Sequence, residues 1–117
     1  PVAGSFNTEA AHRGKTVFDA NCARCHVSGS LSDVNAGTLH APAEVGQSAA
    51  YAERSATKKY RTTPLRGLLH PPQLKGPYFH DGKAKTLDEV VDHYVKLKGL
   101  QLTARQRADL IEYLKSL

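Results

Sequence analysis

The hexapeptide NCARCH, residues 21–26, contains the only two cysteines of the chain and decides how the rest of the sequence is interpreted. Two thiols followed by an imidazole fit three kinds of site: a disulfide, part of a zinc site, or a haem attachment motif. A redox dithiol of this spacing usually follows a strand, and no strand pattern precedes Cys22. Zinc usually takes four ligands, and a histidine directly after a ligating cysteine is badly placed to join them. We therefore favour covalent haem.

The spacing Cys-x-x-Cys-His has a mechanical reason in haem attachment. The two cysteines form thioether bonds to the vinyl groups on one edge of the porphyrin, and the adjacent histidine binds the iron from the proximal side. The sequence predicts one covalent haem c, with Cys22 and Cys25 as attachment residues and His26 as proximal ligand.

Composition limits the remaining possibilities. The 117 residues predict a single domain, residues 1–117, and no apolar run approaches the roughly 20 residues that span a bilayer. The net charge of +5 favours an acidic partner surface. Because the basic residues are scattered and aromatic content is only 7%, we expect no nucleic-acid binding. The predicted partner is a redox protein with an acidic docking surface, and the predicted oligomeric state is a monomer.

The segment before the cysteines has the pattern of a helix over residues 7–25. Asn7 or Thr8 can cap it, and small or apolar residues recur at helical spacing at Ala11, Gly14 and Phe18. The next stretch is rich in Ser, Ala and Gly, which predicts a long loop with a helical turn near Pro42 to Tyr51. Residues 62–83 contain four prolines and three glycines and cannot form a long helix.

Two further helices are predicted near the C-terminus. Thr86 and Glu89 form a capping-box pattern for a helix that ends at Gly99, and Thr103 and Gln106 repeat the pattern for the last helix. The apolar positions of the two helices are Leu87, Val90, Val91, Tyr94 and Val95 in the first, and Leu110, Ile111, Leu114 and Leu117 in the second. We see no strand signal and predict an all-α fold with three to four helices. So much loop in a small domain suggests that a large apolar cofactor fills its centre.

Several of these residues carry a resemblance to known families. Gly14 and Phe18 in the first helix, with Tyr113 of IEYL in the last, resemble class I c-type cytochromes, in which a glycine of the first helix meets an aromatic residue of the last. Residues 57–117, including GPYFHDG and TLDEVVDHY, are similar to the C-terminal haem domain of bacterial dihaem cytochrome c peroxidases and their methylamine-utilisation relatives. They are more similar still to short periplasmic cytochromes with one haem. This chain has a single haem motif, so the resemblance does not carry over peroxidase activity.

The second axial ligand of the iron is left open by the sequence, because the chain has no methionine. The resemblance implies Tyr94, since the methylamine-utilisation relatives place a tyrosine near the end of the corresponding helix. Imidazole is the more common iron ligand, which makes His93 our second choice, on the flank of that helix beside Glu89 and Lys96. We also keep His40, His70, His80 and an open position as candidates, while His12 is expected at the surface.

Other residues are candidates for the surroundings of the haem. Arg66 resembles a position that meets haem propionates, for which a guanidinium is suited, although an ordinary surface arginine is equally consistent. His80 is interpreted as a partner of a propionate or of a ligand. The residues expected to line the ring are Tyr78, Phe79, Leu65 and Leu68.

These interpretations together predict an electron carrier. A histidine or tyrosinate in place of methionine favours ferric iron, so we expect a low potential. Haem is attached outside the cytoplasm, which predicts a periplasmic protein whose export signal is absent from this sequence starting at Pro1. Two competing hypotheses are a haem sensor or peroxidase-like protein with an open or displaceable distal site, and a module of a larger enzyme that receives electrons.

Overall fold

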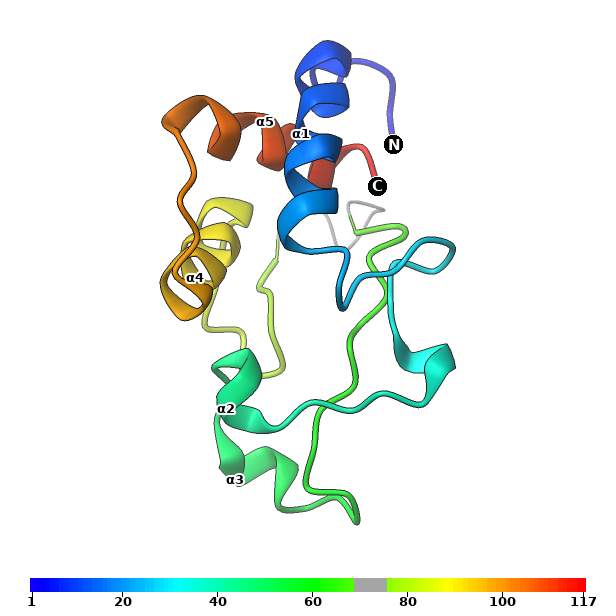
Figure 1. Ribbon diagram of the computed structural model, residues 1–117, viewed down its shortest axis with the longest axis vertical. Coiled ribbons are helices and arrows are strands. Elements are labelled where there is room, and N and C mark those ends of the chain that lie inside the picture. The colour runs from blue at the N-terminus through cyan, green and yellow to red at the C-terminus, as the bar shows by residue number, and fades with distance from the viewer. Residues whose placement is uncertain (69–75) are drawn as a thin grey trace.

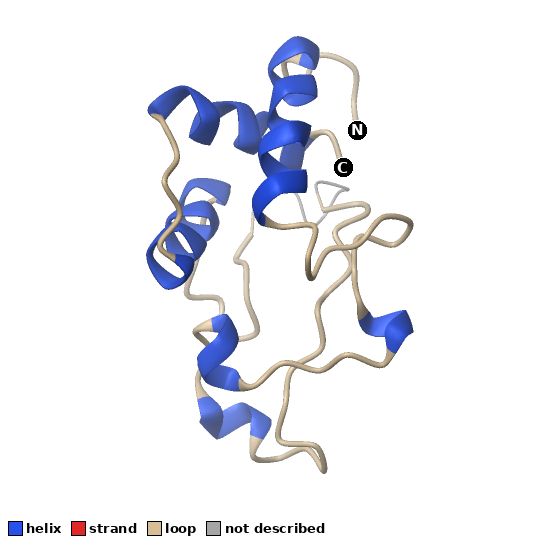
Figure 2. Ribbon diagram, viewed as in Figure 1, coloured by secondary structure: helices blue, strands red, loops and turns tan. Residues whose placement is uncertain are grey.

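Three long helices form the framework of the protein, as the sequence pattern predicts. They are α1 (Thr8–Asn21), α4 (Leu87–Lys98) and α5 (Ala104–Lys115). The computed structural model describes residues 1–68 and 76–117, and these also contain a 3-10 helix, Val34–Ala36, and two single-turn helices, α2 (Pro42–Val45) and α3 (Ala49–Ala52) (Figures 1 and 2). The described part therefore has five α-helices, and the all-α prediction is confirmed.

The helix starts follow the predicted caps. The Asn7 side chain accepts a hydrogen bond from the Ala10 N–H, and the Thr86 hydroxyl accepts one from the Glu89 N–H. Thr103 and Gln106 form a complete, reciprocal capping box at α5. In α4 the box is only half formed, because the Glu89 carboxylate accepts from the backbone of Lys85 instead of Thr86.

Helix α4 ends where the sequence predicts, whereas α1 ends earlier than predicted. Gly99 ends α4 in the left-handed conformation, φ 63°, which a glycine adopts without strain. The predicted first helix, residues 7–25, is four residues too long, because the backbone leaves the helix after Asn21 with Cys22 as its C-cap. The haem motif therefore lies on the turn that follows α1.

Helices α1 and α5 cross in close contact, which is the main helix packing of the fold (Figure 1). Gly14 permits the approach, since a Cβ there would lie 1.9 Å from the Asp109 carbonyl oxygen and 2.9 Å from Tyr113 Cβ. One turn on, the rings of Phe18 and Tyr113 pack with centroids 5.0 Å apart. The predicted contact of a glycine with an aromatic residue is confirmed.

The hydrophobic core is small and is concentrated at this helical end. Six of its seven buried members come from the three long helices, and one, Leu31, comes from a loop. The members are Phe18, Leu31, Leu87, Val91, Leu110, Ile111 and Leu114. None of the helices in the described ranges is both long and apolar enough to cross a membrane.

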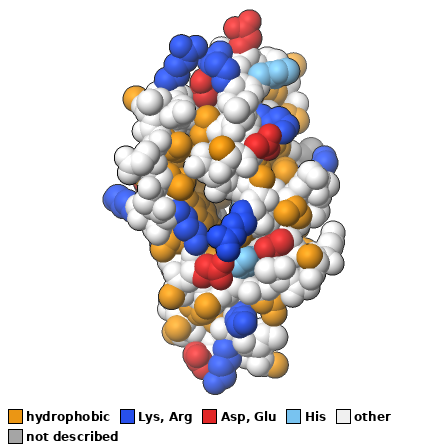
Figure 3. Space-filling model, in the orientation of Figure 1, with side chains coloured by type: hydrophobic (Ala, Val, Ile, Leu, Met, Phe, Trp, Pro, Cys, Tyr) orange, Lys and Arg blue, Asp and Glu red, His pale blue; other side chains and the backbone are white. Residues whose placement is uncertain are grey.

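Long loops make up the other half of the molecule and are tied together by a few polar contacts. His40 and Tyr60 exchange backbone hydrogen bonds of 2.7 and 2.8 Å, and the Ser32 hydroxyl donates to the Thr62 carbonyl at 2.6 Å. In residues 1–68 and 76–117 this bridge and that of Tyr78 with Ala84 are the only β-type pairings. Figure 3 shows a hollow near the middle of one face, edged by hydrophobic side chains and by Lys or Arg.

Candidate functional site

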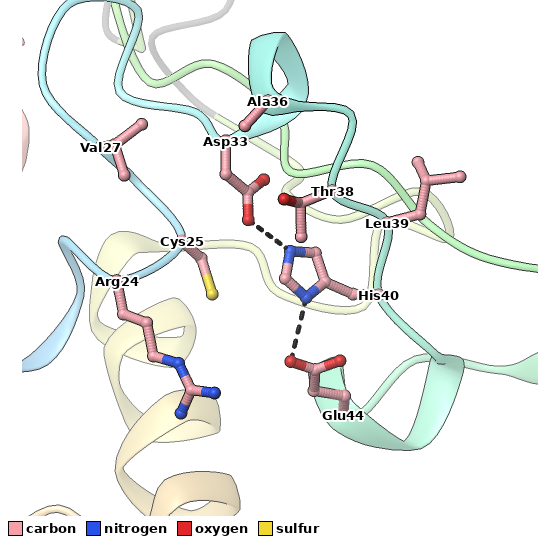
Figure 4. A pocket seen from close by; sticks show the side chains of 9 residues that line it. All are labelled: Arg24, Cys25, Val27, Asp33, Ala36, Thr38, Leu39, His40 and Glu44. Carbon is pink, nitrogen blue, oxygen red and sulfur yellow. Dashed lines mark hydrogen bonds and ion pairs between the residues drawn. The ribbon is translucent and has the colours of Figure 1, made fainter.

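The cysteine turn is built by the end of α1. The Cys22 N–H donates to the Phe18 carbonyl, and the N–H groups of Cys25 and His26 then both donate to the Cys22 carbonyl, at 3.2 and 3.0 Å. This tight turn brings the three motif residues onto one short segment at the edge of the core. Cys22 packs against the core, whereas Cys25 lines a cavity of about 310 Å³ (Figure 4).

Both cysteines are free thiols. Burial raises the pKa of Cys22 to about 11, with a further contribution from Cys25, and burial also raises the pKa of Cys25. A reactive redox dithiol requires a thiol of lowered pKa. The disulfide and redox interpretations of the motif therefore gain no support from this environment.

His26 is held in the form that a metal ligand needs. Its Nδ1 lies 2.9 Å from the carbonyl oxygen of Leu31. A carbonyl only accepts, so Nδ1 carries the proton and the lone pair of the neutral ring is on Nε2. Burial lowers the pKa of His26, and this effect outweighs the Leu31 hydrogen bond, which raises it. The lowered pKa keeps the ring neutral. Two free thiols beside an oriented, neutral imidazole fit the attachment of a haem.

Tyr94 lies on the half-buried face of α4. Burial raises its pKa above the ordinary value, and the charges of Cys25 and Cys22 raise it further, so the tyrosine is within electrostatic range of the cysteine turn. Its ring packs against Phe79, with centroids 6.1 Å apart, and edge-on against His93. Within the described ranges no residue forms a hydrogen bond with its hydroxyl.

His93 lies half-buried on the flank of α4 that carries Glu89 and Lys96, and this side of the helix is covered by another segment. Its Nε2 lies 2.9 Å from the Val45 carbonyl oxygen, and its ring packs 4.8 Å from that of Phe79. Gly46 makes room for the imidazole, since a Cβ there would come within 2.7 Å of it. The end of α2 packs against this side of α4, a long-range contact that helical periodicity cannot show.

The remaining candidates are spread over different environments. Leu65, Leu68 and Tyr78 pack against the core, and their role in lining the ring stays a prediction. Arg66 is exposed and its Nε donates to the Gly29 carbonyl. His80 is also exposed and lies about 5 Å from the rings of two tyrosines, Tyr51 of α3 and Tyr60.

Three further histidines occupy other positions in the sequence. His12 is exposed on α1, as predicted, and His70 lies outside the described residues. His40 is buried and contacts two carboxylates, Asp33 and Glu44. This cluster was not anticipated from the sequence. Its only sequence signal is the spacing of His40 and Glu44, four residues apart.

Comparison with known proteins decides the family. Residues 11–117 match the profile of the family described as "Cytochrome c". The chain belongs to the cytochrome c family. Its cofactor is therefore covalent haem c, and its role is haem-based, either in electron transfer or in a peroxidase-like reaction.

Relatives of this cytochrome carry two kinds of name. It is 31% identical to the methylamine utilization protein MauG of Methylorubrum extorquens and 28% identical to MauG of Methylophilus methylotrophus, over 92% and 94% of the chain. Half of the chain is 37% identical to cytochrome-c peroxidase IdrP1 of Denitromonas iodatirespirans. The chain spans 34%, 37% and 18% of these relatives' lengths, which is less than two fifths of each. No solved structure matches it.

Proposed function

We propose that this protein is a periplasmic electron-transfer cytochrome of low potential. One haem would be bound through Cys22 and Cys25, with His26 as proximal ligand and Tyr94 as distal ligand. The observation that carries the proposal is the state of His26, a neutral ring beside two free thiols whose Nδ1–H donates to the Leu31 carbonyl. Such a second-sphere hydrogen bond orients metal-bound histidines in general.

When bound, the haem supplies reversible one-electron exchange at iron. The chain's own residues hold the haem, limit its contact with water and influence its potential. The turn after α1 fixes the spacing of Cys22, Cys25 and His26. The core residues beside that turn, among them Phe18 and Leu31, would keep water away from His26 when it holds the iron. An oxygen ligand in place of a methionine thioether stabilises ferric iron, which lowers the potential.

Tyr94 is preferred over His93 for a physical reason. The Nε2 of His93 is already engaged with the Val45 carbonyl, and the ring is wedged between Gly46 and Phe79. Coordination by His93 would break these contacts, whereas the Tyr94 hydroxyl has no such partner to lose among the described residues. Burial opposes ionisation of the tyrosine, and ferric iron, as a close positive charge, would offset that cost.

The test of the distal ligand is a set of ferric spectra. Tyr94→Phe is expected to remove the distal donor, which converts the spectrum from low-spin to high-spin and raises the potential. His93→Ala is expected to leave the coordination of the iron intact, and Tyr51→Phe, at an exposed tyrosine, serves as the control. A Tyr94→Phe protein with the parent spectrum would refute this assignment, and a spectral change confined to His93→Ala would favour the histidine.

Partner and location follow from charge and chemistry. The net charge of +5, reduced by the propionates of a bound haem, favours a redox protein with an acidic docking surface. Covalent haem attachment outside the cytoplasm supports a periplasmic location.

A peroxidase-like reaction is the second candidate. It is supported by the similarity of half of the chain to a protein named as a cytochrome-c peroxidase. That function requires a distal position that opens to peroxide or to a small gas. The 117 residues contain one haem motif, so this reaction would need an electron source other than a second haem within them.

A further inference from the structure

A cluster of three ionisable side chains, two of them buried, lies beside the cysteine turn (Figure 4). His40 is only 4% exposed, and its backbone is fixed by the bridge to Tyr60. Its Nε2 lies 2.8 Å from Asp33 Oδ2 and its Nδ1 lies 3.0 Å from Glu44 Oε1. Asp33 is also buried, whereas the Glu44 side chain is 41% exposed.

The geometry requires a proton on each ring nitrogen. Ionised carboxylates only accept hydrogen bonds, so both nitrogens of His40 donate and the ring is an imidazolium. Burial alone would lower the pKa of His40, but the hydrogen bonds to Glu44 and Asp33 outweigh it and the pKa lies above its ordinary value. Burial likewise opposes ionisation of Asp33, and hydrogen bonding, including that from His40, lowers its pKa overall.

Other charged or ionisable side chains lie near the cluster on the neighbouring segments. They are Arg24 and Cys25 of the cysteine turn, which line the same cavity, Lys98 of α4, which donates to the Glu44 carbonyl, and His26, which lies within electrostatic range of His40. Arg24 and Lys98 act mainly on Glu44, whose pKa is lowered first by its hydrogen bond with His40.

The position of the cluster connects it to the cofactor. Cys25 Sγ, an oxygen of Asp33 and a ring nitrogen of His40 all lie within 4.8 Å of one another. In the proposed function that sulfur is bonded to the porphyrin edge. A buried charge so close to the haem interacts strongly with it, because water screens the interaction little.

We propose that His40, held between Asp33 and Glu44, is a proton-binding site whose occupancy is coupled to the electron on the haem. The inference rests on the proposed function. When a reduced redox protein supplies one electron to the haem, unprotonated His40 takes up one proton from the solvent. One N–H bond forms, and no other bond changes. Glu44, which is partly exposed while His40 is buried, connects the site to water.

The proposal fixes the direction of a pH dependence. Protonated His40 places a positive charge near the haem and favours the reduced state, so the potential falls as pH rises through the pKa of His40. The pKa of His40 is raised above the ordinary histidine value of about 6.5. The potential is therefore expected to fall at a pH above that value. A proton affinity about tenfold higher in the reduced protein corresponds to a total fall of about 59 mV for one electron.

The test is the midpoint potential of the haem-loaded protein from about pH 5 to about pH 9, a range that brackets the ordinary histidine pKa. His40→Gln is expected to remove the fall. Glu44→Gln replaces one of the two charged acceptors by a neutral amide, which lowers the pKa of His40, so the fall in potential should move to lower pH. Glu53→Gln, at an exposed glutamate paired with Lys58, is the matched control and should reproduce the wild-type curve.

Each outcome has a defined meaning. A flat wild-type curve, or an unchanged fall in both His40→Gln and Glu44→Gln, overturns the proton site and leaves electron transfer intact. Absence of a reversible one-electron couple overturns both. If His40→Gln does not fold, Glu44→Gln decides, because that side chain is partly exposed. NMR titration of the His40 ring in both redox states then gives the pKa difference directly.

Discussion

Replacement of Cys22 and Cys25 together by alanine is expected to yield a chain without covalently bound haem and with little stable tertiary structure. The seven buried members of the core are concentrated at the helical end, and only Leu31 comes from the long loops. The loops around residues 27–68 therefore depend on the cofactor for apolar contacts. A small domain with so limited a core has little free energy of folding to lose.

The measurement is the haem content of the denatured chain together with the thermal unfolding of the isolated protein. Each single variant keeps one thioether position and should retain part of the covalent haem. Cys22→Ala should be the less stable of the two, because Cys22 packs against the core. Arg24→Ala, at the exposed position between the two cysteines, is the control and should keep a full complement of haem. Haem that remained attached to the double variant would contradict the assigned attachment residues.

Enlargement of Gly14 is expected to have the largest effect among substitutions outside the haem motif. A Cβ there would lie 1.9 Å from the carbonyl oxygen of Asp109, well inside any permitted contact, and that atom belongs to the backbone of a packed helix. Helices α1 and α5 must separate to admit it. Overpacking in a core typically costs about 1–3 kcal/mol, and we expect Gly14→Val to exceed this range.

The comparison with alanine makes the test specific. Helix propensity alone predicts that Gly14→Ala stabilises α1 by about 1 kcal/mol. The contact with α5 predicts the opposite, a loss of stability. Ala20→Val, at an exposed position of the same helix, measures the cost of a branched side chain without the contact. A Gly14→Ala protein that unfolds at or above the wild-type temperature would contradict the packing described for α1 and α5.

The elements that local chemistry defines were predictable from the sequence. The caps at Asn7, Thr86 and Thr103 and the left-handed end at Gly99 are decided by residues within one turn of each helix end. The haem-attachment roles of Cys22, Cys25 and His26 stay a prediction, which rests on the spacing that thioether attachment requires. The contact at Gly14 followed from a resemblance, since periodicity shows that this position is buried but not what it touches.

The features that were missed depend on contacts between distant segments. The flank position of His93 was predicted, but its partner there, the Val45 carbonyl 48 residues earlier in the chain, was not. Asp33 had no sequence signal at all, because its link to His40 forms only once the loop is closed by the bridge to Tyr60. Neither helical periodicity nor capping chemistry contains information about such closures.

The central claim, that this cytochrome is an electron carrier with a closed distal site, is tested most directly by adding carbon monoxide to the reduced protein. We predict low-spin optical bands in both redox states and no change on addition of the gas, because a six-coordinate iron leaves no position for it. A high-spin band in the ferric protein with ready binding of carbon monoxide would contradict the claim and favour the peroxidase-like function.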